Sequence, residues 1–239
     1  MSFSFTGLAY LFSFFGLGLL SYRFFQYWKR EKTTLSKLFL YFISIFEFFI
    51  FITAIAGLFF AKNIQILKVV VVSDIFLQGL ASAIVGYLII YLKFPKVSPW
   101  LGFWIIFLLG LATTVLTIII PFEPSFDPSG AIDWDVGKFP TSILRTIIFL
   151  ITFLPLVVIM FQQFITSKDF YIKTKALGLG LICLFGLIMG FLDFFLEKIL
   201  KLGAISSDIA MGFLSVIVLI LVFRTQKPPP SPYVKKVYE

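Results

Sequence analysis

Apolar residues run along this chain in long blocks that short polar segments separate. The blocks are long enough for helices to cross the hydrocarbon core of a bilayer, which takes about 20 residues. The pattern predicts seven membrane-spanning helices, at residues 5–27, 38–61, 69–92, 99–121, 142–166, 176–200 and 208–223. We therefore expect an all-α membrane protein with a seven-transmembrane-helix bundle over residues 1–224 and a Pro-rich basic cytoplasmic tail over residues 225–239.

The composition also predicts a membrane protein, and it restricts the catalytic and metal-binding chemistry that the chain can carry out. Hydrophobic residues make up 60% of the chain and charged residues 13%, which is too few to cover a water-facing surface. The chain has no histidine, so the commonest zinc ligand and general base is missing. Its single cysteine, Cys183, lies in an apolar block, where we expect inert packing. We predict no enzymatic activity, no catalytic residue, no metal and no cofactor.

The distribution of basic residues predicts the orientation, because Lys and Arg near the ends of spans are retained in the cytoplasm. One set of alternate loops holds fourteen of them and the other holds five, while Arg145 begins the fifth span. We expect the N-terminus outside and the C-terminus in the cytoplasm of a prokaryotic cell membrane, which the chain crosses several times. The net charge of +8 then reports topology, and we expect no nucleic-acid partner.

One apolar block contains an acid. Residues 69–88 read VVVVSDIFLQGLASAIVGYL, with Asp74 inside the run and Gln78 one helical turn further on. An ionised carboxylate facing lipid at mid-bilayer costs roughly 2.5–3.5 kcal/mol on insertion scales. Asp74, Gln78, Ser82 and Gly86 recur every four residues and so share one stripe of the helix. We expect this stripe to face other helices.

Ionisable residues of other spans should meet that stripe. The helical rise places Asp74, Asp193 and Arg145 in the outer half of the bundle and Glu47 about halfway across. We predict a ligand-binding site formed by Asp74, Gln78, Arg145 and Asp193, with Glu47 as a deeper polar contact. Two alternatives stay open: the same residues are ionic or hydrogen-bonded links between helices, or they form an ion or proton path.

The longest connection, FEPSFDPSGAIDWDVGKFP, carries four acids: Glu123, Asp127, Asp133 and Asp135. Carboxylates are calcium ligands, but this spacing fits no calcium-binding pattern. We therefore expect a solvated acidic loop, which could lie over the ligand site as a lid.

The last third of the chain resembles a known family. SKDFYIKTKALGLGLICLFGLIMGFLDFF followed by LGAISSDIAMGFLSVIVLILVFRTQ is similar to the end of the seven-helix sensor region that precedes bacterial histidine kinases. The positions that match the family's basic loop, glycines, outer acid and final arginine are Lys173, Lys175, Gly178, Gly180, Asp193 and Arg224. The resemblance implies detection of an extracellular or membrane-dissolved signal. Without a histidine to accept phosphate, this chain would signal through another protein.

These observations lead to one functional expectation and two alternatives. We expect a non-enzymatic membrane sensor or receptor-like module embedded in a lipid bilayer. It would bind a small polar or amphipathic molecule, or a lipid, in an outward-facing pocket, and signal to a separate cytoplasmic protein partner. The alternatives are an ion- or proton-conducting channel or transporter component, and an accessory membrane subunit of a larger complex.

Overall fold

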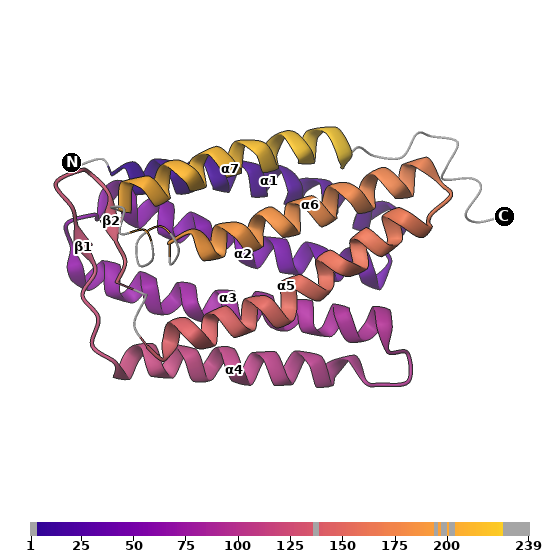
Figure 1. The fold of residues 1–239 in the computed structure, drawn as a ribbon, viewed down its shortest axis with the longest axis horizontal. Helices are drawn as coiled ribbons and strands as arrows, with labels where there is room; N and C mark the ends of the chain where they lie inside the picture. Colours follow the sequence, from indigo (N-terminus) through magenta and orange to yellow (C-terminus); the bar gives the residue numbers. More distant parts are fainter. Residues whose placement is uncertain (1–3, 136–138, 194–195, 197–199, 201–203, 227–239) are drawn as a thin grey trace.

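The computed structural model describes residues 4–135, 139–193, 196, 200 and 204–226. Within these residues the chain forms seven α-helices and one β-hairpin (Figure 1). The elements are α1 (Phe5–Glu31), α2 (Thr34–Phe59), α3 (Ile64–Lys93), α4 (Pro99–Ile119), β1 (Ser125–Phe126), β2 (Ile132–Asp133), α5 (Thr141–Thr166), α6 (Phe170–Asp193) and α7 (Ala204–Thr225). All seven described helices are long and apolar enough to cross a membrane, which confirms the predicted class.

Side-chain caps mark where four of the described helices begin: α1, α2, α3 and α6. The side chains of Ser4, Thr33 and Asn63 accept hydrogen bonds from backbone N–H groups in the first turns of α1, α2 and α3. Asp169 Oδ1 accepts from the N–H of Tyr171 at 2.8 Å, so α6 starts at Phe170, six residues before the predicted span. Residues 197–199 at the end of that predicted span, and the tail from residue 227 onwards, lie outside the described residues.

Six of the described helices form a closed ring. Around it, α1 packs on α2, α2 on α3, α3 on α5, α5 on α6, α6 on α7, and α7 returns to α1. α4 lies outside the ring against α3 and α5, and Figure 1 shows it at one edge of the bundle, with α5 crossing obliquely. Two contacts between helices that are not consecutive, α3 with α5 and α7 with α1, therefore close the ring.

The bundle has two different ends. At one end, which we call the hairpin end, α1, α3, α5 and α7 begin and the β-hairpin is attached (Figure 1). Strands β1 and β2 are antiparallel, and Gly130 between them takes a φ of +88°, which suits glycine. The N–H of Phe5 donates to the Gly130 carbonyl at 2.8 Å, so the hairpin is joined to the start of α1. We call the opposite end, where α7 ends, the tail end.

α3 and α4 approach each other through glycines. A Cβ atom added to Gly79 would lie 2.9 Å from the Cα of Gly110, which is closer than two such atoms can pack. Gly86 and Gly102 meet in the same way nearer the tail end. Small residues of this kind let two membrane helices pack backbone to backbone, and they attach α4 firmly to the ring.

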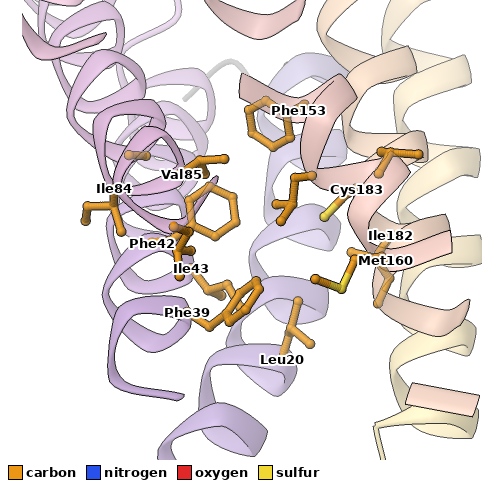
Figure 2. Close-up of a cluster of buried hydrophobic side chains, with 14 of the residues drawn as sticks. Leu20, Phe39, Phe42, Ile43, Ile84, Val85, Phe153, Met160, Ile182 and Cys183 are labelled. Atoms are coloured by element: carbon orange, nitrogen blue, oxygen red, sulfur yellow. The ribbon is translucent and has the colours of Figure 1, made fainter. Parts of the chain in front are cut away.

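Buried apolar side chains fill the half of the bundle nearer the tail end (Figure 2). We call this cluster the tail-half core. Its labelled members in Figure 2 are Leu20, Phe39, Phe42, Ile43, Ile84, Val85, Phe153, Met160, Ile182 and Cys183. Aromatic rings stack within it, as between Phe149 and Phe153, whose centroids lie 5.2 Å apart. Cys183 is a buried member of this core, as the sequence led us to expect.

Candidate functional site

A cavity of about 150 Å³ lies inside the ring of helices. All six ring helices contribute to its wall, and among the described residues α4 contributes none. Ser13, on this wall, lies eight residues into α1, or about 12 Å from the hairpin end at the rise of roughly 1.5 Å per residue. Phe149, Ile182 and Val218 belong both to the wall and to the tail-half core. The core therefore forms the floor of the cavity.

The charged part of the wall is formed where α3 and α5 meet. Arg145, four residues after the start of α5, donates from Nη2 to Oε1 of Gln78 on α3 at 3.3 Å. Both side chains line the cavity. The structure thus brings together two of the residues that the sequence placed in one site.

Most of the remaining wall is apolar. Aromatic and thioether side chains line it, from Phe46 and Phe49 on α2, Phe149 on α5, Met189 on α6 and Met211 on α7. Aromatic rings and flexible methionines are typical of sites that hold an apolar ligand. The cavity wall therefore combines one charged and a few polar residues with a mostly apolar surface.

Asp74 is buried beside the cavity but does not line it. Its Oδ2 atom accepts a hydrogen bond from the Thr53 hydroxyl of α2 at 2.6 Å. Its Oδ1 atom has no hydrogen-bond partner within the described part of the chain. The stripe of α3 that contains Asp74 and Gln78 faces other helices, as the sequence predicted. Within it, Asp74 faces α2, whereas Gln78 faces the cavity.

The other two predicted site residues are not on the described wall. Glu47 is half-buried on α2 and faces α1, where a Cβ atom on Gly18 would lie 3.1 Å from Glu47 Oε1. Asp193 ends α6 three residues after Gly190, which lines the cavity, and the Asp193 side chain lies outside the described residues. Contact of Glu47 or Asp193 with a ligand stays a prediction.

A buried polar seam between α1 and α7 was not predicted. The Thr6 hydroxyl donates to Asp208 Oδ2 at 2.6 Å and accepts from the N–H of Ile132 in the hairpin at 2.7 Å. One heptad further, the hydroxyls of Ser13 and Ser215 lie 2.5 Å apart. The signal in the sequence was an equal spacing: both pairs are 202 residues apart, and seven residues separate the positions on each helix.

Three carboxylates of the acidic loop accept hydrogen bonds from backbone N–H groups of the same loop. Asp127 Oδ1 accepts from the N–H of Ser129 at 2.7 Å, and hydrogen bonds from Ser129 hold the pKa of this exposed carboxyl below its ordinary value. Asp133 and Asp135 accept from backbone N–H groups within the loop at 2.8 and 2.9 Å. A search of the described residues finds no cluster of three metal-binding side chains. The loop also borders the site, since Trp134 packs edge-on against Tyr10 of the cavity wall.

Fold and site together define a multi-pass, all-α integral membrane protein whose described helices enclose a cavity. Comparison with protein-family models, with curated proteins and with solved structures finds no match. The resemblance to sensor regions of bacterial histidine kinases therefore stays a prediction.

Proposed function

We propose that this protein is a non-enzymatic, receptor-like module that binds a small amphipathic molecule in the cavity inside the helix ring. The observation that carries the proposal is the cavity itself, whose wall contains Arg145 and Gln78 together with aromatic and thioether groups. A concave, mostly apolar site with a few convergent polar groups is typical of small-molecule binding.

The proposed orientation follows from the basic residues. With most Lys and Arg retained in the cytoplasm, the hairpin end faces outside and the cavity lies in the outer half of the membrane of a prokaryotic cell. α7 contributes Met211 and Ser215 to the cavity wall and continues to Thr225 at the tail end. A shift of α7 on ligand binding would thus reach a separate cytoplasmic partner.

The tail-half core supports a receptor over a conducting path. An ion or proton path needs polar groups or water across the whole span. Below the cavity, the described cluster consists of aromatic and aliphatic side chains, with Leu88, Leu156 and Val222 fully buried. An apolar floor of this kind suits a site that a ligand enters and leaves from the same side of the membrane.

A second candidate, a proton- or cation-translocating component, is favoured by one observation. Asp74 is a buried acid within a span, and its Oδ1 atom lacks a hydrogen-bond partner in the described residues. An acid in that position can take up and release a proton. Proteoliposomes loaded with a pH-sensitive dye separate the candidates: the receptor passes no protons, whereas a flux that Asp74→Asn abolishes would support translocation.

Two glycines offer a matched test of the cavity. A Cβ atom on Gly186, in the cavity wall, and one on Gly212, outside it, would each meet no atom within 4 Å. Gly186→Leu should therefore fill the cavity, and Gly212→Leu should leave it open, with little strain in either variant.

The experiment is a thermal-shift screen of the purified chain in detergent against small amphipathic molecules. A ligand of the cavity should raise the unfolding temperature of the wild type and of Gly212→Leu and leave that of Gly186→Leu unchanged. Hits that stabilise both leucine variants equally, or a screen without hits, would refute binding in this cavity.

A further inference from the structure

We infer that the outer groove between α1 and α2 binds a transmembrane helix of a different protein, which carries a lysine or arginine near mid-membrane and pairs it with Glu47. This inference goes beyond the proposed function, because it does not involve the cavity. Four observations support it: the depth of Glu47, its exposure on the outside of the ring, the small residues beside it, and the positions of the chain's own cations.

Glu47 is an acid at the middle of a span. It lies thirteen residues after the start of α2 and twelve before its end, which places it about 20 Å from the tail end at the rise of roughly 1.5 Å per residue. Lipid headgroups begin roughly 15 Å from the bilayer centre, beyond the reach of this side chain. A carboxylate at this depth therefore needs a protein group, rather than a headgroup, as its partner.

The half-buried side chain of Glu47 is open to the outside of the ring. Phe48 and Phe51, which follow it on α2, are both exposed on the membrane-facing surface. Across the groove on α1, Tyr22 is exposed in the same way, one turn from Gly18. Glu47 is not part of the described wall of the cavity inside the ring. A second membrane helix can therefore reach its carboxyl group from the lipid.

Glu47 makes no hydrogen bond or ion pair within the described part of the chain. The hydroxyls of Ser21 and Ser44 lie about one turn nearer the tail end and are 3.1 Å from each other. Ionisable groups inside membrane proteins almost always pair with another protein group or face water. Charge complementarity therefore selects a basic side chain, supplied by another helix, as the partner of Glu47.

Small residues give that helix access to the carboxyl group. Gly18 of α1 lies opposite Glu47, and a Cβ atom at this position would lie 3.1 Å from Glu47 Oε1. Ser21 and Ser44 continue the line of small side chains toward the tail end. Glycine and serine at the contact let membrane helices approach closely, so a long basic side chain of the incoming helix can extend along the groove to Glu47.

The chain's own cations argue against a second copy as the occupant, since copies in one membrane share the same orientation. Arg23 comes nearest in depth, but it lies five residues, or about 8 Å, closer to the tail end than Gly18. Arg145 lines the cavity. The other basic residues of the described helices lie nearer the helix ends: Lys29, Arg30, Lys37, Lys68, Lys93, Lys173, Lys175 and Arg224.

The test uses three synthetic transmembrane peptides of about 20 residues, mostly leucine and alanine, with lysine, leucine or glutamate at the central position. Energy transfer between the labelled full chain and each labelled peptide, in phosphatidylcholine vesicles at pH 7, measures their association. We expect the lysine peptide to bind about tenfold more tightly than the leucine peptide, and the glutamate peptide to bind more weakly than the lysine peptide.

Variants locate the effect. Glu47→Gln should remove most of the preference for the lysine peptide, and Glu123→Gln, the loss of an exposed loop carboxylate, should preserve it. Gly18→Leu should weaken binding of the lysine peptide several-fold by filling the groove, and Gly212→Leu should not. Gly18→Leu leaves the acid in place, so it provides the test if Glu47→Gln does not fold.

Three outcomes would overturn the inference. The first is equal binding of the lysine and leucine peptides, or a lysine preference that Glu47→Gln does not reduce. The second is a glutamate peptide that binds as tightly as the lysine peptide, which would show a hydrogen bond between neutral acids. The third is self-association of the full chain that Glu47→Gln abolishes, which would make a second copy the occupant. All three leave the receptor proposal to the screen with amphipathic molecules.

Discussion

The two halves of the bundle are built from the same helices and differ in what these helices bury. Near the hairpin end they bury hydroxyls and the carboxyl groups of Asp74 and Asp208, together with smaller apolar clusters, around a cavity. Near the tail end they bury rings and aliphatic chains without a comparable cavity among the described pockets. The cavity lies in the half of the bundle that buries these polar groups.

The contact between α1 and α7 shows this change along a single seam. Successive heptad positions pair Thr6 with Asp208 and then Ser13 with Ser215, both through hydrogen bonds. At the next heptad, Leu20 and Val222 are both buried members of the tail-half core. The seam thus passes from hydrogen-bonded to apolar over about four turns of helix, and the cavity lies beside its polar part.

The largest effect should come from the tail-half core. Phe153 is 3% exposed and contacts the rings of Phe149 and Phe42, so Phe153→Ala would leave a cavity that its neighbours cannot close. We expect a loss of about 3 kcal/mol in the free energy of unfolding, at the low end for buried Phe because lipid also solvates apolar surface. Thermal unfolding in detergent, with urea titration where it is reversible, measures this loss.

The matched variant in the other half is Met189→Ala. Met189 is half-buried and already borders the cavity, so its removal costs fewer packing contacts, and we expect a loss of about 1 kcal/mol. Equal losses for the two variants would contradict the division of the bundle into a packed half and a hollow half.

An intermediate effect should come from the polar end of the α1–α7 seam. Thr6→Val keeps the shape of a fully buried side chain and removes its hydroxyl, so the seam loses the bond to Asp208 and the hairpin loses the acceptor for the Ile132 N–H. We expect a loss of about 1–3 kcal/mol in the free energy of unfolding. Hydrogen exchange of the Ile132 amide should become faster, since the hairpin is then held less firmly.

The conservative variant Thr6→Ser retains the hydroxyl and serves as the control. It should keep slow exchange at Ile132 and most of the stability. If Thr6→Val leaves the exchange rate of this amide unchanged, the hydrogen bond does not anchor the hairpin.

Much of the fold could be predicted from the sequence because the bilayer imposes it. Long apolar blocks predicted seven helices long enough to span a membrane, and the four-residue recurrence of Asp74, Gln78 and Ser82 predicted a stripe on α3 that faces other helices, as Asp74 and Gln78 do. What each side chain of the stripe contacts could not be predicted in this way. Asp74 and Gln78 are one turn apart, yet a small difference in angle turns Asp74 to Thr53 and Gln78 to the cavity.

The contact between α1 and α7, which closes the ring, also could not be predicted from local sequence patterns. α1 and α7 are separated by most of the chain, and Thr6, Ser13, Asp208 and Ser215 are common near helix ends, where they usually act as caps. Their equal heptad spacing is informative only once the two helices are known to pair in parallel. Helix starts such as that of α6 depend on a cap, Asp169, which hydropathy does not detect.

The smallest change in stability should come from a substitution that extends the apolar seam into the polar half. Ser13→Leu with Ser215→Val places at the second heptad the residue types found at Leu20 and Val222. Replacing both partners of a buried hydrogen bond by apolar groups is often nearly neutral, and the leucine can occupy the cavity, so we expect the free energy of unfolding to change by less than about 1 kcal/mol. Ligand binding should nevertheless be lost, because the added side chain takes up space in the cavity. Thermal unfolding without ligand and the thermal-shift screen with amphipathic molecules, made on the same preparation, measure the two effects separately. A double variant that unfolds readily would show that the Ser13–Ser215 pair holds the two helices together, and one that is stable and still binds would place the ligand outside the ring.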